Sequence, residues 1–145
     1  MPGLFERRPR LTRLRLPATL QAELFAQALA APSLEICGLL GGQDELATHC
    51  YAVPNVAAAP ATSFHLDPRA QLRAMKCMRE RGEALLGIYH SHPTGPALPS
   101  ARDRALAAYP GVAYLIVSPA DPDGPALGSF VFEAGDFLPL AIEPA

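Results

Sequence analysis

The amino-acid sequence predicts a single α/β or α+β domain built on a mixed β-sheet. The chain has 145 residues, which suits one hydrophobic core rather than two. Hydrophobic residues make up 50% of the chain, so this core can be substantial. Short apolar runs that end at turn residues are interspersed with segments of helical spacing, and this mixture is typical of helices packed on a sheet.

The first third of the chain is expected to contain a strand, a helix and two neighbouring strands. Apolar and polar residues alternate within residues 11–16, which predicts a strand. Pro17 suits the first turn of a helix that Pro32 ends, and the apolar residues between them recur at helical spacing: Leu20, Leu24, Phe25, Ala28 and Leu29. Residues 36–40 form an apolar run closed by two glycines, so we expect a buried strand, with residues 45–53 as its hairpin or sheet neighbour.

A loop and a capped helix are expected in the middle of the chain. Small residues dominate residues 55–61, which we interpret as a loop, and residues 63–66 are a candidate short strand. Asp67 can accept hydrogen bonds from the free backbone N–H groups of a helix start, and Pro68 suits the first helical position. This helix should run to about residue 81, where Gly82 can end it.

The last part of the chain is expected to form strands interrupted by one short helix. Residues 84–90 are apolar and indicate a central strand. A loop rich in Pro and Gly follows over residues 92–99, and a short helix over residues 100–109. Further strands are expected over residues 112–117, 128–132 and 137–142.

Positive charge is concentrated at the beginning of the chain, although the net charge is only −2. The arginines of this segment are Arg7, Arg8, Arg10, Arg13 and Arg15. They fit either a solvated terminus with the outer face of an edge strand, or an arm that touches nucleic acid or an acidic protein. We favour the first interpretation, so no nucleic-acid partner is expected. Whether the basic segment of about residues 1–10 is flexible stays open.

The sequence predicts a soluble, cytoplasmic protein without membrane attachment. No apolar run is long enough to span a bilayer, and arginines break the apolar stretch that a signal peptide would need after its positive charges. The three cysteines, Cys37, Cys50 and Cys77, form no CxxC pair, and their odd number does not suit a disulfide framework. We expect buried free thiols in a reducing compartment, and the role of Cys37 stays open.

Two histidines at the end of the expected central strand are candidate metal ligands. Side chains two residues apart on a strand point to the same face, so His90 and His92 can turn their imidazoles toward one point. Two imidazoles suit zinc. Asp103 lies in the first turn of the next expected helix and can supply a third ligand when the intervening loop folds back. His, His and Asp leave one position for water, which is the pattern of a catalytic zinc site.

Hydrolysis at such a site also needs a base. Glu35 precedes the 36–40 strand, and if that strand pairs with the 84–90 strand, its carboxylate can take a proton from zinc-bound water and deliver it to the leaving amine. Ser100 can donate a hydrogen bond to the developing oxyanion. Each residue also has a purely structural interpretation: Ser100 and Asp103 fit a helix-capping pair, Glu35 a charge at a strand end, and the histidines a packed or surface pair.

The order and spacing of these residues resemble the JAMM (MPN+) metalloprotease motif. Its general form is a Glu, then H-S/T-H-P, six residues, and S-x-x-D. Glu35, His90-Ser91-His92-Pro93 and Ser100-x-x-Asp103 fill every defining position of this motif. The segments around Glu35 and directly before the 68–81 helix are similar too, so the resemblance extends from about residue 11 to about residue 137.

The resemblance implies one zinc ion per chain, bound by His90, His92 and Asp103, with Glu35 as general acid/base and Ser100 as transition-state stabiliser. It also implies a fold related to the cytidine deaminases, with a curved mixed sheet flanked by helices and one domain over residues 1–145. Family members cleave isopeptide or peptide bonds after the tail of ubiquitin or ubiquitin-like proteins. The short chain looks like the small stand-alone prokaryotic members, which act on ubiquitin-like sulfur-carrier proteins or their conjugates with a Gly-Gly tail.

Other functions stay open at this point. A non-catalytic scaffold or interaction protein of the same fold is the main alternative, although inactive relatives typically lose the glutamate or the ligands. A zinc nucleoside deaminase would need an H-x-E signature and a P-C-x-x-C pair, and the sequence has neither. A RadC-like protein usually has Asn where this chain has Ser91. The sequence does not decide between isopeptide, linear peptide and cysteine-adduct substrates, and a homodimer stays open.

Overall fold

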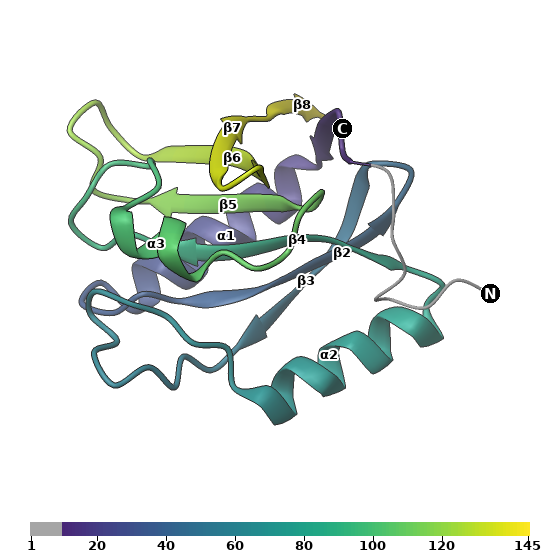
Figure 1. The fold of residues 1–145 in the computed structure, drawn as a ribbon, viewed down its shortest axis with the longest axis horizontal. Coiled ribbons are helices and arrows are strands. Elements are labelled where there is room, and N and C mark those ends of the chain that lie inside the picture. The colour runs from purple at the N-terminus through teal and green to yellow at the C-terminus, as the bar shows by residue number, and fades with distance from the viewer. Residues whose placement is uncertain (1–9) are drawn as a thin grey trace.

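The computed structural model describes residues 10–145, which form an eight-stranded sheet with helices packed on its two faces (Figure 1). The strands are β1 (Arg13–Leu16), β2 (Cys37–Gln43), β3 (Leu46–Val53), β4 (Ala84–Ser91), β5 (Ala113–Ser118), β6 (Ala126–Glu133), β7 (Asp136–Pro139) and β8 (Ala141–Pro144). The helices are α1 (Ala18–Ala30), α2 (Pro68–Glu80) and α3 (Ala101–Leu106). The prediction about the basic segment of residues 1–10 lies, apart from Arg10, outside the described residues.

The sheet is mixed, as predicted, and its strand order is β7-β6-β5-β4-β2-β3-β1-β8. β4 pairs with β5 in parallel, and β1 pairs in parallel with β3 and β8, whereas the other neighbours are antiparallel. β7 and β8 stand at opposite ends of this order, although Leu140 alone separates them along the chain. The sheet therefore curves until its two ends lie close together, and the Leu140 N–H donates to the Ser129 carbonyl of β6 there at 2.9 Å. The curved mixed sheet flanked by helices is confirmed.

Two hydrophobic clusters hold the long helices against opposite faces of the sheet. α1 contacts one face through its buried residues Leu20, Leu24 and Ala28. α2 contacts the other face through Ala74, Met75 and Met78. α2 begins as predicted, because Asp67 accepts the Ala70 N–H at 3.1 Å and Pro68 occupies the first helical position. It stops just before Gly82, whose φ of +70° is a left-handed conformation that favours glycine.

A β-bulge in β4 determines which way the last residues of this strand point. Leu40 of β2 lies opposite Gly87, whereas the next residue of β2 lies opposite Leu85, so β4 has one extra residue at this place. Beyond the bulge, Ile88 packs in the cluster under α2. His90 comes two residues later and therefore points to the same face of the sheet. α3 lies beside the ends of β4 and β5 on this side of the molecule (Figure 1).

The predicted strand over residues 63–66 is wrong. Leu66 makes an isolated bridge to Asn55, and the rest of the segment has no regular secondary structure. The Asn55 side chain provides the hydrogen bonds that a partner strand would provide. Its Nδ2 donates to the Ser63 carbonyl at 2.9 Å, and its Oδ1 accepts from the His65 N–H at 3.0 Å.

The helix predicted over residues 100–109 is shorter than expected. α3 ends at Leu106, and the next two residues continue in an extended direction. The N–H groups of Ala108 and Tyr109 donate to the Tyr114 hydroxyl at 3.2 and 3.0 Å instead of to helical carbonyls. A side chain on β5 thus competes with the helix for these backbone groups.

The predictions for the C-terminal strand and for the edge strand also need correction. Residues 137–142 contribute to two strands, β7 and β8, because the buried Leu140 turns the chain from one end of the sheet to the other. β1 is not an edge strand, since β8 pairs along its outer side. The exposed Arg13 forms an ion pair across these two strands with Glu143, at 2.8 Å.

One thiol that was predicted to be buried is exposed, and so is one residue of the apolar row in α1. Leu29 is 64% exposed, because it follows the buried Ala28 and is turned about 100° away from it around the helix. Cys77 is exposed on α2, Cys50 is half-buried and Cys37 is buried, and all three are free thiols as predicted. Within residues 10–145, no helix combines the length and the apolar character that crossing a membrane requires.

Candidate metal centre

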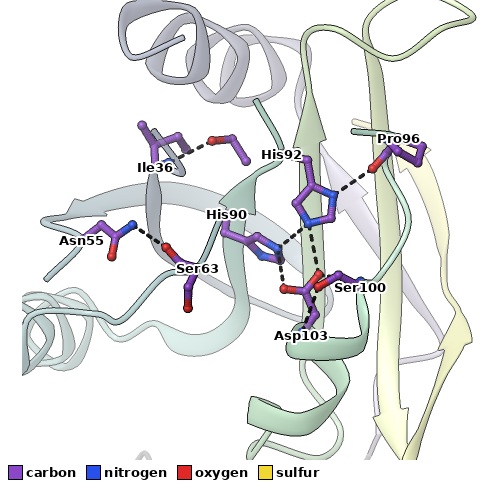
Figure 2. A network of polar contacts seen from close by, with 9 residues as sticks. Ile36, Asn55, Ser63, His90, His92, Pro96, Ser100 and Asp103 are labelled. Atoms are coloured by element: carbon purple, nitrogen blue, oxygen red, sulfur yellow. Dashed lines mark hydrogen bonds and ion pairs between the residues drawn. The ribbon is translucent and has the colours of Figure 1, made fainter. Parts of the chain in front are cut away.

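Three side chains meet where β4 ends, and each offers one atom that could bind a metal (Figure 2). His90 Nε2 lies 3.1 Å from Asp103 Oδ1, and His92 Nε2 lies 3.1 Å from Asp103 Oδ2. The two Nε2 atoms are themselves 3.1 Å apart. The structure therefore brings together the three residues that the sequence predicts as ligands, although they come from different elements.

Strand pairing and helix capping position these three side chains. His90 is on β4 and lies opposite Ile116 of β5, and the His92 N–H extends this pairing by donating to the Val117 carbonyl at 2.9 Å. Asp103 is held by a capping box at the start of α3. Its N–H donates to Ser100 Oγ at 3.0 Å, and its Oδ2 accepts the Ser100 N–H at 2.8 Å.

The geometry and the chemistry of this triad fit zinc. Zinc bonds of about 2.0–2.1 Å at tetrahedral angles place neighbouring ligand atoms about 3.3 Å apart, close to the separations found here. His92 Nδ1 donates to the Pro96 carbonyl at 2.8 Å, which leaves the lone pair of Nε2 available for a metal. Two imidazoles and one carboxylate form a borderline donor set that suits this ion.

The His90 ring is positioned differently from the His92 ring. Its Nδ1 is buried and has no hydrogen-bond partner within residues 10–145. The Phe64 ring stacks on it instead, with centroids 4.4 Å apart and an interplanar angle of 17°. Sequence reasoning missed Phe64 and Pro96 as parts of the site, because neither residue type is a metal ligand and neither lies at a distinctive spacing from the histidines.

The surroundings of Asp103 favour its ionised form. Burial alone raises the pKa of Asp103, but hydrogen bonds with His90 and His92 outweigh it and hold this pKa well below its usual value. Burial lowers the pKa of His90, against the opposing effect of Asp103. Burial also acts to lower the pKa of His92, but bonds to Asp103 and Pro96 outweigh it, so this pKa is raised. A charged Asp103 facing imidazoles is suited to binding a cation.

Glu35 is a buried carboxyl group within reach of the charges of the triad. It precedes β2 and is only 6% exposed, and its Oε1 has no hydrogen-bond partner among the residues that the structure describes. Burial raises the pKa of Glu35 to about 7, with Asp103 adding to the rise and the charges of His92 and Arg102 opposing it. A carboxyl group with a pKa near neutrality can both accept and donate a proton. The strand predicted over residues 36–40 begins one residue later and ends three residues later than expected, since β2 spans Cys37–Gln43 and includes the two glycines.

Ser100 is exposed at the start of α3. Its hydroxyl oxygen accepts the Asp103 N–H, which is the capping role that the sequence left open. A hydroxyl that accepts one hydrogen bond still has its own proton to donate. The capping role and the predicted stabilising role of Ser100 are therefore compatible with each other.

A cavity of about 360 Å³ adjoins the centre. Phe64 contributes to both, because it stacks on His90 and also lines the cavity. Most of the other lining side chains are apolar, among them Leu66, Ile88, Leu106, Tyr109 and Tyr114. The exposed His65 is at the rim, whereas His49 bonds to Glu83, just before the opposite end of β4, and belongs to a different region.

Comparisons with known sequences place this site in context. A sequence model described as prokaryotic homologs of the JAB domain matches residues 17–130. A desampylase of Haloferax volcanii is 39% identical over 94 residues, which are 63% of this chain and 68% of the relative. A probable TtuB-protein conjugate cleaving protease of Thermus thermophilus is 43% identical over 90 residues, 62% of this chain and 60% of the relative. A CysO-cysteine peptidase of Mycobacterium tuberculosis is 34% identical over 97 residues, 66% of each protein.

Solved structures extend the likeness to almost the whole chain. A protein of Desulfitobacterium hafniense superposes with a TM-score of 0.82 and 38% identity, covering 91% of this chain and 92% of that protein. A structure described as a JAMM metalloprotease-like zinc site in the proteasome and signalosome superposes with a TM-score of 0.55, covering 90% of this chain and 98% of that one. Its sequence identity is 19%, so this second comparison supports the fold alone.

Proposed function

The chain belongs to the family of prokaryotic homologs of the JAB domain, and from this premise we propose that it is a zinc metallopeptidase. Its substrates are proposed to be ubiquitin-like or sulfur-carrier proteins, cleaved at the (iso)peptide bond that follows a C-terminal Gly-Gly tail. The observation that carries the proposal is the buried Glu35 beside the triad of His90, His92 and Asp103. A base next to a metal-binding triad is the arrangement that metal-assisted hydrolysis requires.

His90, His92 and Asp103 are proposed to hold one zinc ion per chain. Zinc bound there supplies Lewis acidity, which makes water a better nucleophile and polarises the carbonyl of the substrate. The Pro96 carbonyl fixes the tautomer of His92, and Phe64 fixes the plane of the His90 ring. These two contacts keep the ligand atoms in place before the ion and the substrate arrive.

Glu35 is proposed to act as general base and then as general acid. It accepts a proton from water while the water oxygen forms a bond to the carbonyl carbon. It then donates the proton to the leaving amine as the C–N bond breaks, so that protons balance over one turnover. The burial that raises the pKa of Glu35 to about 7 supports both directions of this transfer.

Ser100 is proposed to stabilise the oxyanion that forms on the carbonyl oxygen. Its hydroxyl proton is not used in the capping box, where the oxygen acts as an acceptor. One donor of this kind typically contributes about 10²–10³-fold to kcat. We expect Ser100→Ala to cost less activity than removal of Glu35, because the base remains in place, although the capping bond is lost together with the oxyanion bond.

The substrate class is supported by what the relatives are named for. Their names specify a desampylase, a TtuB-conjugate cleaving protease and a CysO-cysteine peptidase. These matches span 60–68% of the relatives, so the transfer of substrate class to this chain remains part of the proposal. A cytoplasmic location and a single catalytic domain over the whole chain are likewise proposed, since both fit a small protein-processing enzyme.

The test is a cleavage assay on small sulfur-carrier proteins of the source organism. Each carrier is supplied in three forms that follow the Gly-Gly tail: a linear fusion, a lysine isopeptide and a cysteine adduct. Zinc content is measured on the same preparation. Cleavage that a chelator abolishes and zinc restores is the expected result. About one zinc per chain without cleavage of any form would favour a non-catalytic scaffold, and a protein that binds no zinc would contradict the metal site.

A further inference from the structure

We propose that Ser91, the residue between the two histidines, is a positioning residue that fixes Glu35 against the metal centre, with Asn55 as its counterpart on the other side. This inference rests on the proposed role of Glu35 as the base. It assigns a task to a side chain that binds no metal and is not expected to touch substrate. The task is to join the segment that carries the base to the strand that carries two of the ligands.

Ser91 contacts the backbone on both sides of Glu35. It is 1% exposed and points away from the metal centre, as expected for a strand residue between two inward-pointing histidines. Its Oγ accepts the Ile36 N–H at 2.8 Å and donates to the Leu34 carbonyl at 3.4 Å. One buried hydroxyl therefore binds the residue before Glu35 and the residue after it.

The bond from the Ile36 N–H to Ser91 Oγ lies where the regular pairing of β2 and β4 stops. The ladder between β2 and β4 ends with Cys37 opposite His90, and one further backbone bond joins the Ser91 N–H to the Ile36 carbonyl at 3.0 Å. The Ile36 N–H has no such backbone acceptor and bonds to Ser91 Oγ instead. Without that hydroxyl, a partly buried backbone N–H would lose its acceptor, and the bond from the Ser91 N–H to the Ile36 carbonyl would be left to join the segment of Glu35 to the end of β4.

Asn55 completes the attachment from the opposite side. Its Nδ2 donates to the Glu35 carbonyl at 2.9 Å, while the Glu35 N–H donates to the Pro60 carbonyl at 2.8 Å. Asn55 also binds the Ser63 carbonyl, as Figure 2 shows, and the His65 N–H on either side of Phe64. The base and the ring that stacks on His90 are thus held by one amide side chain.

The metal ligands do not depend on the Ser91 hydroxyl. His90 is positioned by the β4–β5 pairing, and the His92 N–H bonds to the Val117 carbonyl. Removal of the hydroxyl should therefore move the base and leave the zinc ligands in place. A displacement of about 1 Å at a catalytic group typically costs about a hundredfold in rate.

The experiment compares Ser91→Ala and Ser91→Thr, with Ser129→Ala as matched control. Threonine keeps the hydroxyl, so its variant should recover most of the activity. Ser129 is also buried, at 7% exposed, but its Oγ has no partner within residues 10–145, so its loss should change nothing. Ser91→Ala should keep about one zinc per chain and lower kcat about 10–100-fold, with KM changed less than about threefold.

Amide hydrogen exchange gives a second readout that needs no activity. The Ile36 N–H should exchange at least about tenfold faster in Ser91→Ala than in wild type, and at nearly the wild-type rate in Ser91→Thr and Ser129→Ala. Wild-type kcat in Ser91→Ala, loss of zinc in that variant, or unchanged Ile36 exchange would each overturn the proposal. If the wild type cleaves no substrate, the proposed function fails, but the exchange measurement still tests whether Ser91 holds this segment.

Discussion

Cys37 lies directly opposite His90 in the antiparallel pair of β2 and β4. Continuing this register by two residues sets Glu35 opposite His92, on the same face of the sheet as both histidines. The charge of His92 is accordingly the strongest of the charges that lower the pKa of Glu35. The register of β2 against β4 thus directs a base that precedes one strand toward two ligands at the end of the other.

This register predicts that Glu35→Gln separates metal binding from hydrolysis. Glutamine has nearly the same shape but cannot take a proton from water. We expect the variant to keep about one zinc per chain and to lose about 10²–10⁴-fold in kcat. Zinc content by elemental analysis and kcat on the linear Gly-Gly fusion provide the two measurements. Glu80→Gln, an exposed glutamate on α2, is the control and should behave as wild type.

Removal of a metal ligand should abolish zinc binding together with hydrolysis, unlike removal of the base. His90→Ala or Asp103→Ala leaves two ligand atoms, which is too few for a stable zinc site, so both zinc and hydrolysis should be lost. The readout is zinc affinity measured by competition with a chromogenic chelator. His65→Ala removes an exposed imidazole near the same site and should leave the affinity unchanged. Retention of zinc in the Asp103 variant would show that this carboxylate is not a ligand.

The chemistry of this centre could be predicted because it depends on short spacings. One residue separates the two histidines, and Ser100 and Asp103 share one helical turn, so local geometry nearly determines how they lie. Contacts between distant segments could not be predicted in this way. Phe64 reaches His90, and Asn55 reaches Glu35, only because a loop folds over the end of the sheet.

The errors in the fold have a similar origin. The periodicity of α1 predicts an apolar row but does not show where its border lies, and Leu29 falls on the exposed side of that border. The end of α3 depends on the Tyr114 hydroxyl, which belongs to another element. The near closure of the sheet depends on Leu140 passing from one sheet end to the other. None of these relationships leaves a periodic pattern in the sequence.

The stability of the metal-free protein should depend on pH through Glu35. Burial raises its pKa from 4.5 to about 7, so the folded protein favours the uncharged form more than the unfolded protein does. The stability that this provides is present in full below pH 4.5 and is lost as pH rises through about 7. Glu35→Gln removes this titration. As pH rises from 4.5 to about 7, we expect the free energy of unfolding of this variant to increase by about 1–3 kcal/mol relative to wild type. Above this range the difference between the two proteins should stay constant.

Chemical denaturation of both proteins in the presence of a chelator, at several pH values, measures this difference. Comparing the two proteins cancels the part of the Asp103 and His92 titrations that does not depend on the charge of Glu35. Glu80→Gln should show a difference from wild type that does not vary over the same range. A difference for Glu35→Gln that is independent of pH would mean that the Glu35 carboxyl titrates normally in the folded protein.

Phe64 should contribute to zinc affinity without touching the ion. Its ring stacks on His90, whose buried Nδ1 lacks a hydrogen-bond partner within the described chain, so this stacking takes the place of the usual orienting bond. We expect Phe64→Ala to weaken zinc binding about tenfold, measured by chelator competition. Phe64→Tyr keeps the ring and should bind zinc nearly as well as wild type. Equal zinc affinity in Phe64→Ala would mean that β4 alone orients His90.

Gly128 should be required for the loop that orients His92. A Cβ at this position of β6 would collide with the Ala97 carbonyl, which packs directly on the strand. The same loop contains Pro96, whose carbonyl holds His92 Nδ1, and Asp121 and Ser118 bind the loop on either side of this contact. We expect Gly128→Ala to lower the free energy of unfolding by about 1–3 kcal/mol and zinc affinity about tenfold.

Gly95→Ala adds the same methyl group to the same loop and serves as the control. A Cβ there would lie 3.9 Å from the His92 Cβ, an ordinary van der Waals distance, and the backbone of Gly95 is not in the left-handed region. Its stability and zinc affinity should match wild type. If Gly128→Ala were destabilised but bound zinc as tightly as wild type, the loop would be shown to adjust without moving the Pro96 carbonyl. Equal losses in both variants would instead point to a general sensitivity of the loop, because only the collision at Gly128 distinguishes the two substitutions.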